Sequence, residues 1–359
     1  MPFIMGPGGG TIHNIAMPAT RYIDLPAMRR LMDRVGIVGA IRGIRDNLRE
    51  DFGRWHDFEK SPRTANHSDL GVIELMPVSD HDHFSFKYVN GHPKNIEQGL
   101  MTVMAFGALS EVKTGWPLLL SEMTILTALR TAATSVLAAE LVAREDCRTM
   151  AMIGNGAQSE FQCLGFHHLL GIEEFHLYDL DPKATDKLVR NLGGQMKLIP
   201  HSTINDAVNG VDIITTCTAD KKLAIIVEDS MVEPGMHLNA IGGDCPGKTE
   251  LEGAILQRSK VFVEFAPQSR IEGEIQHQAA DFPVTELWEV LSDPRNGRES
   301  DEQITVFDSV GFGLEDFSGL RYIYQQAIEQ GIGEDLDLMP VLGDVKDLYG
   351  FTQPIPARR

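Results

Sequence analysis

The chain has 359 residues, of which 43% are hydrophobic and 23% charged, and its formal net charge is −19 at pH 7. This length exceeds the usual size of one hydrophobic core and predicts two domains, while the composition is ordinary for a soluble globular protein. The negative charge disfavours nucleic acid and anionic membranes as partners, and it would attract a cationic substrate.

Residues 1–20 contain a run of glycine and proline over 6–10 and are predicted to form a flexible N-terminal arm. No basic leader precedes an apolar core there, so we expect no secretory signal. We also expect no membrane span, because every apolar run is interrupted before the roughly 18 to 20 residues that a bilayer requires. These features together predict a cytoplasmic protein.

Helical spacing marks the next part of the chain. Apolar residues recur at three- and four-residue steps from 23 to about 60, which predicts an N-terminal helical region. A meandering antiparallel sheet is then expected, because short apolar runs are separated by turn residues at 71–76, 84–89, 102–106 and 116–120. The open edges of such a sheet invite pairing between subunits. A long helix is predicted from 121 to about 144.

A strand, a glycine-rich turn and a helix follow over 148–159, which is the local arrangement that binds a dinucleotide pyrophosphate. Gly154 allows a tight turn and Gly156 lets the backbone approach a phosphate. The small residue Ser159 lets the helix pack closely on the strand, and its N-terminus favours the anion. Alone, this motif is weak.

The next apolar run, 174–179, ends in an acid 23 residues after Gly156. A dinucleotide-binding fold places there the carboxylate that bonds the ribose hydroxyls. Asp179 therefore indicates NAD, because it would repel a 2′-phosphate and no arginine follows until Arg190. The competing interpretation is an aspartate that only ends a strand at a turn.

Strand-like runs at 212–218, 235–242, 260–264 and 304–308 alternate with helical segments, and a last helix is expected at 317–330. The predicted fold class is α/β, with a Rossmann-type doubly wound parallel sheet and an α+β domain that contains the antiparallel sheet. The boundaries we expect are 21–130, completed by 321–359, for the α+β domain and 131–320 for the Rossmann domain.

The sequence resembles the ornithine cyclodeaminase and mu-crystallin family, and the resemblance covers nearly the whole chain. The matching motifs lie at 71–77, 86–93, 127–133, 153–159, 242–250 and 306–312. The last two are far more specific than a glycine-rich loop. The resemblance implies conversion of L-ornithine to L-proline and ammonia, with NAD reduced and reoxidised within one turnover. It also implies that residues 21–130 bind substrate and that the first domains of a homodimer join their sheets into one closed barrel.

The resemblance also assigns roles to residues of the proposed active site. Arg63, Lys87 and Arg130 match positions that bind the substrate carboxylate, and a desolvated lysine could also assist proton transfer. Asp244 matches the catalytic acid, and Glu74 is its expected partner near the distal amine. The competing interpretation of Asp244 is a residue that only forms a turn or caps a helix. For Glu74 it is a residue that only forms a structural ion pair.

The remaining expected contacts concern the cofactor, and Val310 matches a substrate contact. The cofactor positions are Thr102, Arg130, Gly154, Gly156, Ala157, Gln158, Asp179, Thr218, Ile241, Gly242, Gly243, Asp244, Lys248 and Ser309. No metal is expected, because the histidines lack ligand spacing. Cys147, Cys163, Cys217 and Cys245 also lack it and are expected to be reduced thiols.

Other activities remain open at the level of the sequence. An amino-acid dehydrogenase such as alanine dehydrogenase, or a ketimine reductase, could use the same site for simple redox chemistry. Lysine cyclodeaminase is a further alternative, because a pocket discriminates one methylene group only weakly. A carrier protein without turnover is the alternative from another class. The presence of Asp244, Lys87 and Arg130 argues against it, because a carrier does not need the geometry for hydride transfer.

Overall fold

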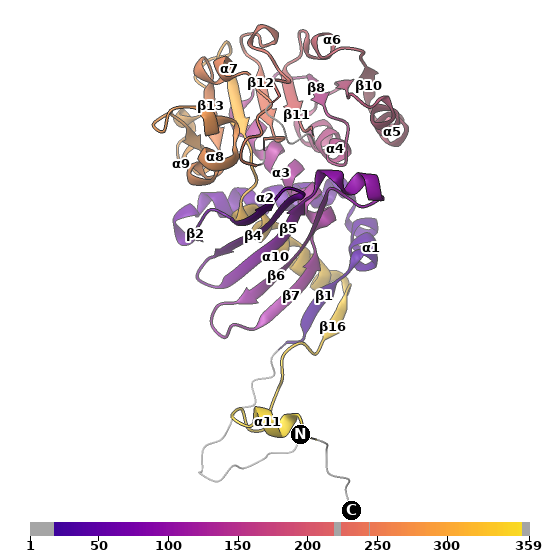
Figure 1. The fold of residues 1–359 in the computed structure, drawn as a ribbon, viewed down its shortest axis with the longest axis vertical. Coiled ribbons are helices and arrows are strands. Elements are labelled where there is room, and N and C mark those ends of the chain that lie inside the picture. The colour runs from indigo at the N-terminus through magenta and orange to yellow at the C-terminus, as the bar shows by residue number, and fades with distance from the viewer. Residues whose placement is uncertain (1–17, 219–223, 244, 354–359) are drawn as a thin grey trace, which may run out of the picture.

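Two sheets organise the chain in the computed structural model, which describes residues 18–218, 224–243 and 245–353 (Figure 1). The first sheet has the strand order β16-β1-β7-β6-β5-β4-β2, with β3 also paired to β4. Its pairings are antiparallel except for β1 with β7. Its strands are β1 (Thr20–Ile23), β2 (Glu59–Lys60), β3 (Thr64–Ser68), β4 (Gly71–Ser79), β5 (His83–Gly91), β6 (Val103–Glu111), β7 (Pro117–Glu122) and β16 (Glu334–Leu336).

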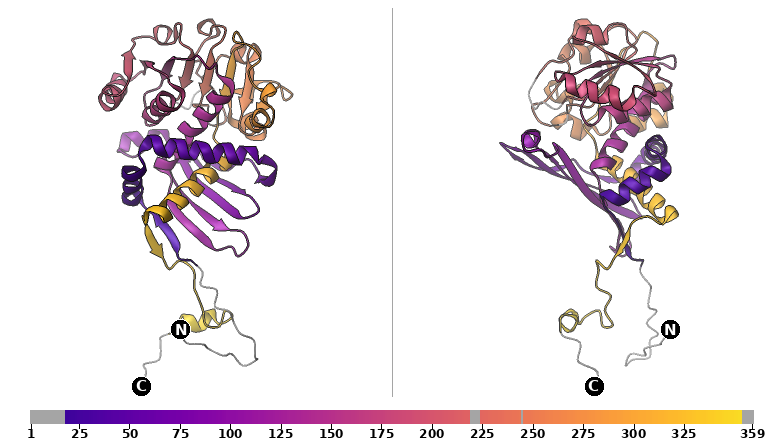
Figure 2. Two further views of the ribbon diagram at one scale, coloured as in Figure 1. Left: turned by 180° about the vertical axis from the view of Figure 1, so that it is seen from behind. Right: turned by 90° about the vertical axis from the view of Figure 1, so that its right-hand side faces the viewer.

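The long helices of this unit lie against one face of the first sheet, as the side view in Figure 2 shows. Strand β4 shows the consequence, since Glu74 and Met76 are buried on the covered face and Ile73 and Leu75 are exposed on the other. The helices of this unit are α1 (Leu25–Val35), α2 (Ile37–Gly53), η1 (Trp55–Asp57), η2 (Pro93–Gln98) and α10 (Gly313–Gln330). The expected helical region from 23 to 60 is therefore interrupted. Gly36, at φ +74°, separates α1 from α2.

The second sheet is parallel throughout and has the order β10-β9-β8-β11-β12-β15-β13-β14. Its strands are β8 (Thr149–Ile153), β9 (Glu174–Tyr178), β10 (Lys197–Pro200), β11 (Ile213–Thr216), β12 (His237–Ala240), β13 (Lys260–Val263), β14 (Thr285–Glu286) and β15 (Thr305–Asp308). The order reverses between β8 and β11, which confirms the predicted doubly wound sheet and marks its ligand-binding switch point.

Short helices connect the strands of this second unit. They are α4 (Ser159–Leu170), α5 (Pro182–Leu192), α6 (Ile204–Val208), η3 (Asp229–Met231), α7 (Gly253–Gln257), α8 (Ala266–Glu272), η4 (Glu274–His277), α9 (Leu287–Ser292) and η5 (Pro294–Asn296). Helix α11 (Leu348–Phe351) instead lies beyond β16, away from both sheets (Figure 1).

Helix α3 (Thr124–Val142) joins the two units and corrects one expectation. It is long and apolar enough to cross a bilayer, so the prediction that no run reaches that length is wrong. However, 78% of its most apolar window is buried inside the protein, where it packs against α2, α4 and α10. A helix that other elements cover on several sides carries apolar residues around most of its circumference. Helix α3 is a core helix of this kind.

The predicted boundaries at 130/131 and 320/321 fall within α3 and α10, and both helices pack against α2. Of the predicted N-terminal arm, residues 1–17 lie outside the described residues, and Thr20 already begins β1. Asp244 also lies outside the described residues, between two segments that the structure describes.

Candidate active site

The turn after β8 forms the nucleotide end of the candidate site. Gly154 has φ +95°, and a Cβ there would lie 2.7 Å from the carbonyl oxygen of Cys217. A Cβ on Gly156 would instead meet nothing within 4 Å. The two glycines therefore serve different purposes, since the first makes the turn possible and the second leaves open space in front of it.

Helix α4 begins immediately after this turn, at the fully buried Ser159. Its hydroxyl donates a hydrogen bond to the carbonyl of Gly156 at 2.8 Å, so serine serves in place of the usual glycine or alanine. The side-chain oxygens Oε1 of Gln158 and Oδ1 of Asn155 are buried and accept no hydrogen bond from the described residues. Orphaned acceptors beside an open glycine are what a bound hydroxyl or amide group would satisfy.

Asp179 follows β9 and borders the same turn. Its Oδ2 accepts from the backbone N–H of Asn155 at 2.6 Å, and its Oδ1 accepts from that of Asp181 at 2.8 Å. The carboxylate is only partly buried. Each oxygen retains a second lone pair for the ribose hydroxyls of a nucleotide.

Three other loops reach this edge of the parallel sheet. The Lys248 ammonium donates to the carbonyl of Thr218 at 2.8 Å, which ties the loop after β12 to the loop after β11. Ser309 follows β15, and its N–H donates to the carbonyl of Ala240 at 2.9 Å. The predicted positions Ile241, Gly242 and Gly243 follow β12 directly, and Ala157 lies in the turn before α4.

Three cations, two from the first unit and one from the connecting helix α3, form the second half of the site. Arg63, before β3, donates to Oε2 of Glu74 at 3.1 Å and to the carbonyls of Val310 and Gly311 at 2.6 Å each. Its Nε also lies 3.2 Å from a carboxylate oxygen of Glu272 on α8. Arg63 thus joins the two units beside the nucleotide edge.

Lys87 lies on the covered face of β5, as its position between two outward aromatic residues predicts, and is only 1% exposed. Its Nζ donates to Oδ1 of Asp316 at 2.9 Å, and Nε of Arg130 donates to the same oxygen at 3.1 Å. Arg130 also donates to Glu315. Burial and then the adjacent Arg130 lower the pKa of Lys87 to about 8.

Four acids of this network were not identified from the sequence: Glu264, Glu272, Glu315 and Asp316. Burial, reinforced by Glu264, raises the pKa of Glu315 to about 8, and burial raises that of Glu264. Ser309 bonds the Glu264 carboxyl, so the acids extend from the cations to the nucleotide loops. One sequence signal was available, because Glu315 and Asp316 lie three and four residues after the end of the motif at 306–312.

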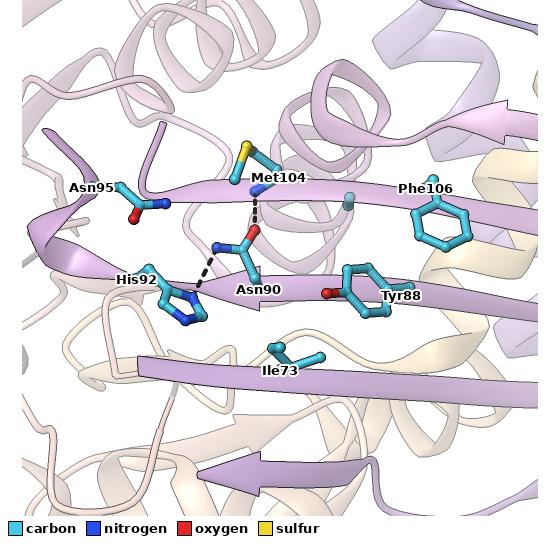
Figure 3. A pocket seen from close by; sticks show the side chains of 8 residues that line it. Ile73, Tyr88, Asn90, His92, Asn95, Met104 and Phe106 are labelled. Atoms are coloured by element: carbon cyan, nitrogen blue, oxygen red, sulfur yellow. Dashed lines mark hydrogen bonds between the residues drawn. The ribbon is translucent and has the colours of Figure 1, made fainter. Parts of the chain in front are cut away.

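The exposed face of the first sheet has a separate depression of about 320 Å³ (Figure 3). Tyr88 and Phe106 stack across β5 and β6 there, with ring centroids 5.0 Å apart. Asn90 accepts from the N–H of Met104 at 2.9 Å. The predicted cofactor residue Thr102 lies beside this depression, where its carbonyl accepts from the N–H of His92 at 2.9 Å. No hydrogen bond or ion pair among the described residues joins Thr102 to the nucleotide turn.

Together the two halves define an enzyme built on two sheets, with a dinucleotide site at the switch point of the parallel one. Residues 27–331 match the ornithine cyclodeaminase/mu-crystallin family, and the chain belongs to that family.

The chain is 54% identical to an ornithine cyclodeaminase of Brucella suis over 331 residues, which are 92% of each chain. Among solved structures, it is similar to a lysine cyclodeaminase described as recognising L-lysine, L-ornithine and L-2,4-diaminobutyric acid. The TM-score is 0.87 at 28% identity, over 92% of this chain and 99% of the other. An archaeal alanine dehydrogenase dimer with bound NAD gives a TM-score of 0.81 at 29% identity, over 89% and 99% of the two chains.

Proposed function

We propose that the chain is an NAD-dependent ornithine cyclodeaminase, which converts L-ornithine into L-proline and ammonia. The observation that carries this proposal is the convergence of Arg63, Lys87 and Arg130 on the nucleotide edge of the parallel sheet. The 54% identity to ornithine cyclodeaminases over 92% of the chain supports the particular reaction. We further propose a cytoplasmic enzyme that degrades ornithine, derived from arginine, and supplies proline.

The nucleotide turn fits NAD. The open space at Gly156 suits a pyrophosphate, and the partly exposed carboxylate of Asp179 suits ribose hydroxyls. Thr218 and Lys248 would complete the site from the neighbouring loops. When bound, NAD supplies a hydride acceptor and then a hydride donor within one turnover.

The cations serve to fix the substrate. A carboxylate bound by guanidinium and ammonium groups holds the adjacent α-carbon in one orientation, which is the main requirement for hydride transfer. Glu74, Glu272 and Asp316 are ion-paired with these cations, and Glu315 accepts a hydrogen bond from Arg130, so all four acids fix the cationic side chains in place. Arg63 donates a hydrogen bond to the carbonyl of Val310, so this predicted substrate contact lies beside the cations.

The distal amine requires acids. The structure supports both interpretations of Glu74, because Oε2 is ion-paired with Arg63 while Oε1 is buried and without a hydrogen-bond partner in the described residues. We propose that Oε1 accepts from the distal ammonium of ornithine. Asp244, which lies outside the described residues, would then take the proton that makes this amine a nucleophile.

Asp244→Ala provides the test of this function. Purified parent protein incubated with L-ornithine and catalytic NAD is expected to form proline and ammonia in equal amounts without net NADH. The variant should lose at least about 100-fold in rate, because an aligned acid-base group contributes about 10²–10⁴-fold. Product analysis with absorbance at the NADH band measures both. A keto acid with stoichiometric NADH would indicate a dehydrogenase instead, and faster turnover of L-lysine would indicate a lysine cyclodeaminase.

We also propose a homodimer formed through the exposed face of the first sheet. Apolar side chains gather on that face in the described residues, and Ile73, Leu75, Phe84, Met104 and Phe106 are each at least 37% exposed. An apolar surface of this kind marks an interaction site. The dimeric state of the archaeal alanine dehydrogenase supports a second copy of the chain as the partner.

Phe106→Glu is expected to convert this dimer into single chains, since it would bury an unpaired charge in the interface. Light scattering after gel filtration measures the mass against the 39.7 kDa of one chain. Ile328→Glu, at a side chain that is 50% exposed on α10, is the matched control and should remain dimeric. A parent protein with the mass of one chain would contradict the proposal.

A further inference from the structure

Three buried carboxyl groups outside the proposed chemistry follow one another along the nucleotide edge of the parallel sheet. They belong to Asp308 at the end of β15, Glu274 at the start of η4 and Glu250 after the loop that follows β12. Each is at most 2% exposed. Burial raises the pKa of Asp308 to about 7, and burial and Asp308 raise that of Glu274. Burying a carboxyl group costs free energy, so three of them in one place indicate that their hydrogen bonds are needed there.

Each carboxyl holds the segment that carries the next one. Asp308 accepts from the N–H groups of Glu274 at 2.8 Å and Ile275 at 3.2 Å. Glu274 accepts in the same way from Glu250 at 2.8 Å and Leu251 at 3.0 Å. These hydrogen bonds connect β15 to η4 and η4 to the end of the loop after β12.

The last carboxyl holds a cofactor loop. Oε1 of Glu250 accepts from the N–H of Thr218 at 2.9 Å and also from its hydroxyl. Thr218 in turn accepts at its carbonyl from Lys248. Thr218 and Lys248 are both among the residues that we propose to bind NAD. The hydrogen bonds of the three carboxyls therefore lead to the proposed cofactor site.

Three glycines make room for these carboxyls. A Cβ on Gly242 would overlap the Glu250 carboxylate, and one on Gly273 would overlap that of Asp308. A Cβ on Gly243 would lie 2.7 Å from Oε1 of Glu274. Gly242 and Gly243, which the family resemblance predicts to contact the cofactor, therefore also leave the space that two buried acids occupy.

We propose that Asp308, Glu274 and Glu250 form a carboxyl series that positions Thr218 and Lys248 for NAD. This inference rests on the proposed use of NAD at this edge. The three residues are positioning residues, since they hold backbone N–H groups and act on the cofactor through Thr218 and Lys248. Substitutions in the series should therefore weaken NAD binding in proportion to the hydrogen bonds that they remove.

The geometry predicts which amide substitution is tolerated. Both oxygens of Glu274 accept from backbone N–H groups, so Glu274→Gln must turn its amide nitrogen toward a donor. Glu250 uses only Oε1 for Thr218, while its Oε2 is buried and accepts no hydrogen bond from the described residues, so an amide nitrogen can take the place of Oε2. Glu250→Gln can therefore keep its hydrogen bonds. The two variants make the same change, from a carboxyl to an amide, but differ in the hydrogen bonds that they lose.

NAD titration by calorimetry is the test, because binding can be measured without turnover. Glu274→Gln is expected to raise the Kd for NAD about tenfold, and Glu250→Gln should stay within about twofold of the parent. Asp212→Asn is the control for general stability. Asp212 accepts from the N–H groups of Arg148 and Thr149 at the opposite end of this sheet. This control should lower thermal stability and leave the Kd unchanged.

Three outcomes would overturn the proposal: an unchanged Kd in Glu274→Gln, equal losses in both glutamine variants, or an equal loss in Asp212→Asn. If Glu274→Gln does not fold, hydrogen exchange on the parent protein still tests the proposed carboxyl series. The amides of Glu250 and Leu251 should be protected before NAD is added, and rapid exchange there would contradict the series. Failure of the proposed reaction is distinguishable, because it would abolish proline formation in the parent and leave these measurements intact.

Discussion

Lys87→Met should reduce kcat/KM for L-ornithine by about 100- to 1000-fold while the protein remains folded. The substitution removes a charge-assisted contact to the substrate carboxylate from a site that excludes water, where such groups contribute most. Asp316 keeps Arg130 as a partner at 3.1 Å, so the loss of stability should be below the roughly 3–5 kcal/mol of an uncompensated buried charge. Steady-state kinetics and thermal unfolding measure the two effects separately.

The pH profile identifies the role of the Lys87 charge. Because burial and Arg130 lower its pKa from 10.5 to about 8, Lys87 is charged below about pH 8 and neutral above it. If the charge holds the carboxylate, kcat/KM of the parent must fall above pH 8. Lys87→Arg, which stays charged, should lack this fall although its rate is lower. A parent rate that rises through pH 8, with no such rise in Lys87→Arg, would instead assign Lys87 to proton transfer.

The same pKa shift has a consequence for folding. Between about pH 8 and 10.5 the unfolded chain binds more protons at Lys87 than the folded chain does. This residue therefore makes the folded state more stable as pH rises through that window, and the cost of its buried charge is fully present below it. Such a cost is consistent with a lysine placed for binding and not for stability.

Local features of the site could be read from the sequence because they depend on neighbouring residues. The strand-turn-helix at 148–159 and the acid at Asp179 have fixed spacing, and alternation along a strand places Lys87 opposite Phe86 and Tyr88. The parallel strands were predicted for the same reason, except β10 and the two-residue β14. Both lie at edges of their sheet and are short, so they carry little pattern.

The partners of the cations could not be predicted in this way. Asp316 meets Lys87 across a separation of 229 residues, and only the packing of α10 on β5 brings them together. The length of α3 was predicted well, but the extent of its apolar stretch was not, and the cause is related. Arg130 interrupts its apolar run in the sequence, yet this side chain is paired with Glu315 and Asp316 inside the protein. Charge in a sequence does not show whether that charge is exposed.

The two glycines of the nucleotide turn should fail in different ways when replaced by alanine, and Gly154→Ala should have the larger effect. Its Cβ would lie 2.7 Å from the Cys217 carbonyl at φ +95°, where any side chain is strained. The left-handed conformation alone costs about 1–2 kcal/mol, and displacement of β11 adds to this. We expect a loss of roughly 2–4 kcal/mol in stability together with loss of NAD binding. Denaturant unfolding and NAD titration measure these quantities.

Gly156→Ala is the matched control, because the structure leaves open space where its Cβ would be and no positive φ is imposed on it. Its unfolding should match that of the parent, since no described atom lies within 4 Å of the added methyl group. If the open space belongs to the pyrophosphate, the same methyl group should raise the Kd for NAD by about tenfold or more. Normal NAD affinity in this variant would mean that the phosphates lie elsewhere. A fold as damaged as that of Gly154→Ala would mean that both glycines serve only the turn.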